Sequence, residues 1–524
     1  MHYAKVYGAQ TSLLTPYIVT VEADLSRGLH SFSIVGLPDK AVEESRDRVA
    51  AAIKHAGFES PKSQNQKIII SLAPADIKKE GPMFDLPIAL SYLLASDSIR
   101  FNPESCLFIG ELALDGALRG VRGVLPLIAE AKKRGMRAVF LPHENAREAA
   151  LVPGIEIYGA ENLLQVIEHL NTKKPRESEL LLAKNKNKKV EIKKLAVTPQ
   201  TTLEAAEVHT PFALEDIRGQ ESAKRAALIA AAGGHNLGLS GPPGTGKTML
   251  ARALNSILPP LTFDEVLEVN SIHSVAGSLR GELMTLPPFR SPHHTSSYVS
   301  IVGGGANPRP GEATLAHRGV LFLDEFPEFD RRVIEALRQP LEDRVIAVAR
   351  AKGTAYFPAR FTLVVAMNPC PCGNFGHAKI QCVCTPTALE RYRRKISGPI
   401  ADRIDLWMQV GPIELGELGK KIARGSETKD TKEKVLRARQ KQTVRFGKEG
   451  KTNSDLSPRD LEELVPLSTN TRTTLERAGT RLNLSPRAFH RVIKVARTIA
   501  DLDGAEHVGE PHILEALQYR ERKS

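Results

Sequence analysis

The stretch Leu237-Gly238-Leu239-Ser240, followed by G-P-P-G-T-G-K-T at residues 241–248, decides the fold of this chain. A short apolar run typical of a buried strand leads into a glycine-rich loop, and Met249 to Ile257 follows with the spacing of a helix. The loop matches G-x-x-x-x-G-K-[ST] in the strand, loop and helix context that a phosphate-binding loop requires. A chance match of a glycine-rich turn is the alternative interpretation.

The loop predicts a site for a nucleoside triphosphate and magnesium. Glycines let backbone N–H groups turn toward phosphate oxygens, and the start of the helix adds its positive dipole end. Lys247 would reach the β- and γ-phosphates, and Thr248 would ligate magnesium. The candidate nucleotide contacts are Gly241, Pro242, Pro243, Gly244, Thr245, Gly246, Lys247 and Thr248.

Two later apolar runs, at residues 320–323 and 361–366, read as strands buried on both faces of a parallel sheet. The first ends in Asp324, a candidate magnesium ligand, and Glu325, a candidate base that polarises the attacking water. The second leads to Asn368, which could orient that water. Acidic residues also cap strand ends, and Asn368 could simply open a turn before a proline.

Length and composition predict a globular protein of two or three domains, with 524 residues, 42% hydrophobic and 25% charged. No apolar stretch is long enough to span a bilayer, and the first residues lack a signal-peptide pattern. We therefore expect a cytoplasmic protein without a membrane partner. A net charge of +12 makes nucleic acid a plausible partner, although a solvated basic face gives the same charge.

Changes in pattern along the chain predict its organisation. Residues 1–170 alternate strand-like and helical segments, and residues 171–204 form a lysine-rich linker, with a nucleic-acid tether as the alternative. Residues 205–412 form a three-layer α/β core with a mostly parallel sheet. Residues 413–524 lack strand signals and are expected to be helical. The clearest expected strands are 67–72 and 138–142, and the clearest helices are 125–134, 160–170, 432–443, 458–464 and 486–502.

Four of the five cysteines lie within fifteen residues, as two C-x-C pairs. Four thiolates can close a tetrahedral zinc site, which predicts a structural metal that staples the loop between them. Reduced thiols without metal are the alternative, and His377 could replace one ligand. The candidate zinc ligands are Cys370, Cys372, Cys382 and Cys384.

Longer motifs resemble those of the magnesium-chelatase-like AAA+ ATPases. They are P-F-R-S-P-H-H-T-S-S at 288–297, G-G-G-A-N-P-R-P-G-E-A-T-L-A-H-R-G-V-L-F-L-D-E at 303–325, M-N-P-C-P-C-G at 367–373 and R-Y-R-R-K-I-S-G-P-I-A-D-R-I-D at 391–405. The match is closest to the YifB/ComM family, because residues 1–170 resemble a Lon-protease-type domain. The resemblance implies a homo-hexameric ring that binds ATP and magnesium. It also implies a helicase that promotes DNA branch migration in natural transformation.

The resemblance also assigns residues to roles. Asn368 matches the family's sensor 1, Arg403 its arginine finger and Arg487 its sensor 2. An arginine finger is contributed to the γ-phosphate held by the neighbouring subunit. The alternatives are a salt bridge from Arg403 to Asp402 or Asp405, and an ordinary exposed helix arginine at position 487.

The segment 271–310 is the part that the family's ring directs toward its central channel. It offers four candidate phosphate contacts on DNA: Arg290, His293, His294 and Arg309. A metal site at the two adjacent histidines is the alternative interpretation.

The Lon-like domain is not expected to be a protease. Lon-type proteases use a Ser and a Lys, where this chain has Met83, in Glu80-Gly81-Pro82-Met83, and Leu125. Neither side chain can form or activate a nucleophile. A role in assembly or DNA engagement is the expectation by analogy.

The sequence therefore favours an ATP-driven motor acting on branched or single-stranded DNA. The alternative is a metal-chelatase-like or chaperone-like AAA+ ATPase that remodels a protein partner.

Overall fold

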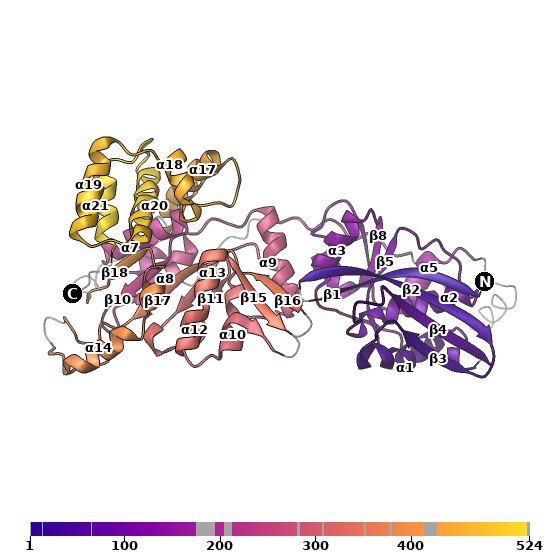
Figure 1. Cartoon of the computed structure of the whole chain (residues 1–524). Coiled ribbons are helices and arrows are strands. Elements are labelled where there is room, and N and C mark those ends of the chain that lie inside the picture. Colours follow the sequence, from indigo (N-terminus) through magenta and orange to yellow (C-terminus); the bar gives the residue numbers. More distant parts are fainter. Residues whose placement is uncertain are drawn as a thin grey trace. The chain divides into compact units, whose positions relative to one another are not determined.

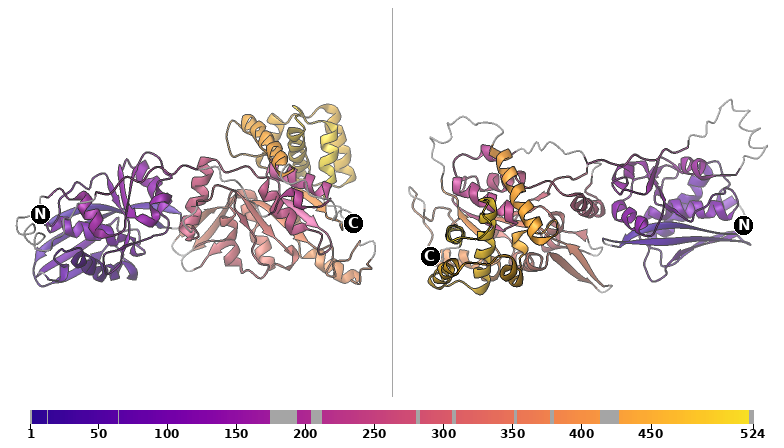
Figure 2. Two further views of the ribbon diagram at one scale, coloured as in Figure 1. Left: turned by 180° about the vertical axis from the view of Figure 1, so that it is seen from behind. Right: turned by 90° about the horizontal axis from the view of Figure 1, so that it is seen from above.

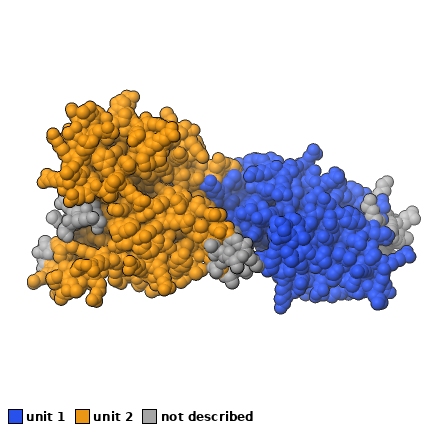
Figure 3. All heavy atoms as spheres, in the orientation of Figure 1, with its two compact units in different colours: residues 1–204, 267–283 blue, residues 205–266, 284–524 orange. Residues whose placement is uncertain are grey.

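The structure, a computed structural model, describes residues 2–12, 14–63, 65–173, 194–203, 212–279, 283–305, 309–350, 353–376, 380–412 and 427–520. They form two compact units (Figures 1 and 3): unit 1 comprises residues 1–204 and 267–283, and unit 2 comprises residues 205–266 and 284–524. His377 and residues 174–193, which hold most of the expected linker lysines, lie outside the described part. No helix in the described part has the length and apolarity needed to cross a membrane.

Unit 1 contains a mixed sheet with the strand order β3-β4-β2-β1-β5-β8-β9. β2 pairs antiparallel with both β1 and β4, and the other neighbours run parallel. The strands are β1 (Tyr3–Ser12), β2 (Thr15–Arg27), β3 (Ser31–Val35), β4 (Gln66–Ala73), β5 (Cys106–Phe108), β8 (Ala138–Pro142) and β9 (Glu156–Ala160), with the short pair β6 (Glu111–Leu112) and β7 (Leu118–Arg119).

This sheet is buried on both faces at β8, whereas β2 and β4 alternate buried with partly exposed residues. Along β8, Phe140 packs into one hydrophobic cluster, and its neighbours Val139 and Leu141 pack into another. A strand buried on both faces has no polar side to present, which explains the continuous apolar run at 138–142. The covering helices are α1 (Lys40–His55), α2 (Asp85–Ala95), α3 (Val124–Lys133), α4 (His143–Ala149) and α5 (Leu163–Leu170).

Unit 2 contains a five-stranded sheet with the order β11-β14-β17-β10-β18, in which every neighbouring pair is parallel. Its strands are β10 (Leu237–Ser240), β11 (Phe289–Arg290), β14 (Val320–Leu323), β17 (Thr362–Met367) and β18 (Leu406–Gln409). Residues in β14 and β17 are almost all buried. β14 has the expected bounds, and β17 begins one residue later than the apolar run predicts.

Unit 2 also contains helices and two small hairpins, of which β15–β16 is labelled in Figure 1. The hairpins pair β12 (Gly303–Gly304) with β13 (Arg309–Pro310) and β15 (Val345–Arg350) with β16 (Gly353–Pro358). The helices are α7 (Glu221–Gly233), α8 (Lys247–Ser256), α9 (Phe263–Ala276), α10 (Tyr298–Val302), α11 (Glu312–Leu315), α12 (Arg331–Ala336), α13 (Arg338–Asp343), α14 (Pro386–Arg394) and α15 (Gly398–Ala401). The division between the units falls within α9.

The C-terminal part is helical, and α17 and α20 pack beside α7 (Figures 1 and 2). Its buried face includes Val435 and Ile499, which share one hydrophobic cluster with Ala230 of α7. A shared core makes these helices part of unit 2 rather than a separate body. They are α17 (Glu427–Phe446), α18 (Pro458–Leu464), α19 (Thr469–Arg481), α20 (Pro486–Leu502) and α21 (Glu510–Gln518).

Candidate nucleotide site and thiolate loop

The phosphate-binding loop lies between the carboxyl end of β10 and the start of α8. Gly244 and Gly246 have φ angles of +76° and +86°. Glycine adopts this left-handed conformation without the steric cost that other residues meet, so the loop can curl into the first turn of α8. The N–H groups that begin a helix have no partners within it and favour an anion at that end.

Lys247 is held inside the loop by three acceptors. Its Nζ donates to the carbonyl oxygens of Gly241 at 2.7 Å and Pro242 at 2.8 Å, and to Oδ1 of Asn368 at 3.3 Å. Burial lowers the pKa of the ammonium group, and the nearby Asp324 carboxylate opposes that shift. A partly desolvated cation beside free helix-end N–H groups fits a polyanionic phosphate chain.

Asp324 and Thr248 come together across the sheet. In the strand register Ser240 of β10 lies opposite Met367 of β17, and Leu323 of β14 lies opposite Val365. Asp324 therefore emerges beside the phosphate-binding loop, where Thr248 Oγ1 donates to its Oδ2 at 2.8 Å. Two neighbouring ligands at about 2.0–2.1 Å from an octahedral magnesium ion lie about 2.9 Å apart, so this oxygen pair fits the metal.

Glu325 carries a strained backbone and an unexpected partner. Its φ is +51°, which is uncommon for a residue with a side chain and concentrates at functional sites. Its Oε2 lies 3.0 Å from Nδ1 of His294. His294 is expected at DNA phosphates from the sequence; in the structure it lies beside the candidate base instead, and no spacing signal connects two residues 31 positions apart.

The other three residues of segment 271–310 that were expected to contact DNA differ in their partners and exposure. Arg290 donates from Nε and Nη2 to the Glu312 carboxylate, at 2.6 and 2.7 Å. His293 makes a hydrogen bond of 2.9 Å with Thr295 Oγ1, and Arg309 is exposed on β13. Arg309 is thus the one of these arginines that the structure leaves facing solvent.

Arg403 and Arg487 lie together, and the backbone of Arg403 lies at the end of the sheet opposite the phosphate-binding loop. Arg403 precedes β18 and accepts, at its carbonyl, a hydrogen bond from Asn236, which precedes β10. Arg403 and Asn236 therefore lie at the amino ends of the parallel strands β18 and β10. The phosphate-binding loop lies at the other end of the sheet, after the carboxyl end of β10. The Arg403 side chain pairs with Glu342, and Arg487 reaches the same carboxylate at 3.5 Å.

Glu342 is a partner that the sequence analysis did not identify. Asp402 and Asp405 were the acids considered for Arg403; Asp405 instead accepts from the backbone N–H of Asn236 at 2.9 Å. The hydrogen bond from Arg403 lowers the pKa of Glu342. Glu342 therefore stays charged and can hold two arginines in one place.

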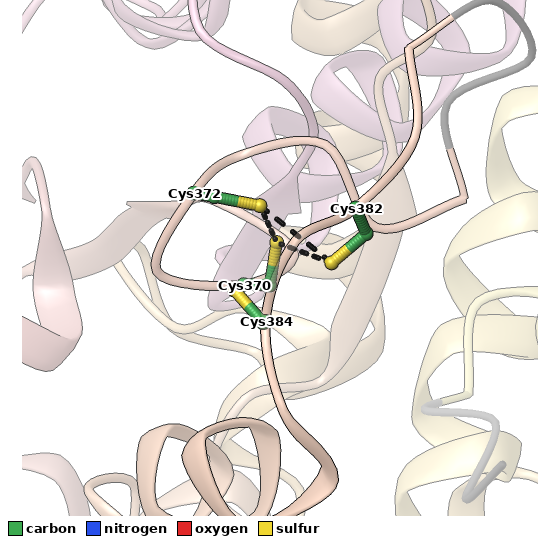
Figure 4. Close-up of side chains that lie close together, drawn as sticks. All are labelled: Cys370, Cys372, Cys382 and Cys384. Carbon is green, nitrogen blue, oxygen red and sulfur yellow. Dashed lines mark hydrogen bonds between the residues drawn. The ribbon is translucent and has the colours of Figure 1, made fainter.

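The four clustered cysteines converge (Figure 4). Cys370 Sγ lies 3.3 Å from that of Cys372 and 3.8 Å from that of Cys382, and the last two are 3.6 Å apart. With Cys384, all four sulfur atoms lie within 4.8 Å of one another. Zn–S bonds of about 2.3 Å place tetrahedral sulfur ligands about 3.8 Å apart, so the arrangement fits zinc.

One thiol of the cluster also has a lowered pKa, which favours its thiolate form. Backbone N–H groups of Asn374 and Val383 lower the pKa of Cys372 to about 6. A thiolate, rather than a thiol, is the metal ligand. Among the described residues, no other group of three or more His, Cys, Asp or Glu side chains converges in this way.

In unit 1, the positions compared with protease catalytic residues are apolar and sheltered. Leu125 is buried in a hydrophobic cluster, and Met83 is half-buried. Neither position offers an atom for nucleophilic attack or proton transfer.

Comparison with known proteins gives this arrangement a family. Competence protein ComM of Haemophilus influenzae is 43% identical over 526 residues, covering 99% of this chain and 98% of ComM. An uncharacterized protein, YifB, of Escherichia coli is 41% identical over 507 residues, covering 96% and 94% of the two chains. The chain belongs to the ComM/YifB family.

Three family models also match the chain. Residues 213–418 match magnesium chelatase, subunit ChlI; residues 425–520 match the ChlI C-terminal model; and residues 21–145 match a further ChlI model. Lon protease 2 of Bacillus subtilis is 26% identical over 187 residues, a third of this chain. The fold is accordingly a magnesium-chelatase-type AAA+ core with a Lon-like α/β domain and a helical C-terminal part, as predicted. The family implies an ATPase that uses ATP and magnesium.

The contact between His294 and Glu325 predicts a selective kinetic defect. A general base acts only when held in hydrogen-bonding geometry to its water, so His294→Ala should lower ATP hydrolysis about tenfold. Nucleotide affinity should stay unchanged, because the phosphate-binding loop is intact. Phosphate release and fluorescent-nucleotide binding measure the two quantities. His293→Ala is the matched control, and a His294→Ala rate equal to wild type would contradict the contact's role.

Proposed function

We propose that the protein is an ATP-driven homo-oligomeric ring, a hexamer, that moves along DNA and promotes branch migration during recombination or the integration of incoming DNA. The observation that best supports an ATP-driven motor is that Lys247, Asp324 and Asn368 come together at one edge of the sheet. The name of the ComM relative, a competence protein, supports the link to natural transformation.

Each residue of the site has a chemical role in this proposal. Lys247 neutralises phosphate charge, and Thr248 with Asp324 holds magnesium, which neutralises the charge that develops on phosphate oxygens. Glu325 takes a proton from the attacking water, while Asn368 fixes the water's position. Asn368 is suited to this because its amide already reaches the loop lysine.

The strand polarity of unit 2 supports an oligomer. Arg403 precedes the amino end of β18 and shares Glu342 with Arg487, whereas the phosphate-binding loop follows the carboxyl end of β10. A strand of four residues at about 3.3 Å per residue separates the two ends by roughly 13 Å. These arginines therefore suit the site of a neighbouring subunit. Glu342 would hold them until that neighbour's phosphates compete for the guanidinium groups.

The positive net charge and two exposed hairpin residues support DNA as the polymer along which the protein moves. The chain carries a net charge of +12. Arg309 is exposed on the β12–β13 hairpin, and Tyr356 is 68% exposed on the β15–β16 hairpin. An exposed aromatic ring can stack on a base, and an exposed arginine can contact a phosphate. An exposed aromatic ring could also contact a polypeptide, so it is the positive charge and Arg309 that favour DNA over the second candidate, a protein-remodelling ATPase.

Mixing two inactive variants tests the shared site. Arg403→Gln lacks the finger and Lys247→Ala lacks the loop cation, so each alone should hydrolyse ATP at a small fraction of the wild-type rate. In random mixed rings about one quarter of the interfaces would pair the intact loop of one variant with the intact finger of the other. Hydrolysis should reappear on mixing. The control mixes Arg403→Gln with the double variant, and recovery absent from the first mixture would contradict a shared site.

A junction assay tests the DNA function. With ATP, the protein should separate three- and four-way DNA junctions into their branch-migration products. With a non-hydrolysable analogue, it should leave the junctions intact. Glu325→Gln should bind ATP and DNA without moving strands. DNA affinity should fall steeply between low and moderate salt, since phosphate contacts release counterions. ATP turnover that ignores DNA would instead favour the protein-remodelling or chelatase-like alternative.

We propose zinc as the metal of the cysteine cluster, because four sulfur ligands at tetrahedral spacing select it. Elemental analysis of gently purified protein should find one zinc per chain, and Cys372→Ser should lower that content. Cys106→Ser is the matched control, since this cysteine lies outside the cluster. Substoichiometric metal in the wild-type protein would refute the assignment.

A further inference from the structure

The thiolate loop, described at residues 370–376 and 380–384, begins immediately beside the nucleotide site. β17 ends at Met367, Asn368 follows, and Cys370 comes two residues later. The Asn368 side chain accepts from Lys247, and its backbone carbonyl accepts from the Tyr392 hydroxyl at 3.2 Å. Tyr392 lies on α14, just after the last cysteine of the loop. This hydrogen bond thus joins the two segments that flank the loop.

The loop also touches the phosphate-binding loop directly. Gly373 has a φ of +81°, and a Cβ placed on it would lie 2.7 Å from Cδ and 3.0 Å from Cγ of Pro243. Real side chains essentially never approach so closely, so the backbone at Gly373 packs against the proline with no space between them. Pro243 is the third residue of the phosphate-binding motif.

Cys370 organises the part of the loop that makes this contact. It is buried, its carbonyl accepts from the N–H of Gly373 at 3.0 Å, and its Sγ accepts from the N–H of Phe375 at 3.2 Å. Figure 4 shows Cys370 facing both Cys372 and Cys382. A metal that fixes its sulfur atom would therefore fix Gly373 against Pro243.

We propose that the metal-loaded thiolate loop is a positioning element of the nucleotide site, so that metal occupancy sets nucleotide affinity. This inference rests on the proposed ATP-driven function and on the metal at the cysteines. Loss of the metal frees Cys370, and Gly373 and Asn368 then lose their fixed places beside Pro243 and Lys247. The alternative is a staple that maintains only its own loop.

Two glycines of the loop give a matched test. Gly376 has a φ of +77°, almost that of Gly373, yet a Cβ there would meet no atom of the described residues within 4 Å. Alanine therefore meets a similar backbone strain at both positions, and only Gly373→Ala presses on Pro243. Both full-length variants should keep the wild-type zinc content. Gly373→Ala should bind a fluorescent ATP analogue at least ten times more weakly, and Gly376→Ala should bind it within about twofold of wild type.

A measurement on the wild-type chain removes any dependence on how the variants fold. A zinc-selective chelator that leaves magnesium in place should weaken nucleotide binding, and added zinc should restore it. Equal affinities of the two glycine variants, or binding unaffected by zinc removal, would overturn the inference and leave the ATPase standing. Failure of the untreated, zinc-loaded protein to bind nucleotide would refute the proposed function itself.

Discussion

The parallel arrangement of β10, β14 and β17 is the constraint on which the candidate site depends. Parallel strands that start level also end level, so the residues that follow them meet at one edge. The phosphate-binding loop follows β10, Asp324 follows β14 and Asn368 follows β17. Two hydrogen bonds, from Lys247 to Asn368 and from Thr248 to Asp324, show that these residues are in direct contact. The glycine-rich loop alone could not supply either acceptor.

Much of the fold follows from local sequence signals. β8 and β14 have the bounds that their apolar runs predict, and α18 and α20 begin at the prolines that mark their first turns. The fold class is confirmed because strands buried on both faces and amphipathic helices carry distinct periodicities. The small hairpins β12–β13 and β15–β16 were not anticipated. β12 and β13 have only two residues each, which is too short for a periodic signal, whereas β15 contains the apolar run 345–349, which was overlooked.

The candidate site was predictable where residues follow strand ends and unpredictable where side chains meet over long separations. Asp324 and Asn368 were placed by their strands. The contact of Glu325 with His294, the sharing of Glu342 by Arg403 and Arg487, and the packing of Gly373 on Pro243 depend on tertiary structure. The roles of these residues in hydrolysis stay predictions. The convergence of the four cysteines was partly predictable. Their close spacing in the sequence indicates a cluster, but the backbone hydrogen bonds that set the shape of the loop cannot be read from the sequence.

The position of Arg403 restricts how copies of this chain could associate. A twofold dimer buries the same patch on both partners, so it completes both sites only if the loop edge and the arginine edge belong to one patch and the two copies pack antiparallel. A head-to-tail contact completes every site without that condition, and it closes into a ring or continues as a filament according to the rotation per step. The angle at which one copy meets the next, rather than the strength of the contact, would then fix how many subunits share the work.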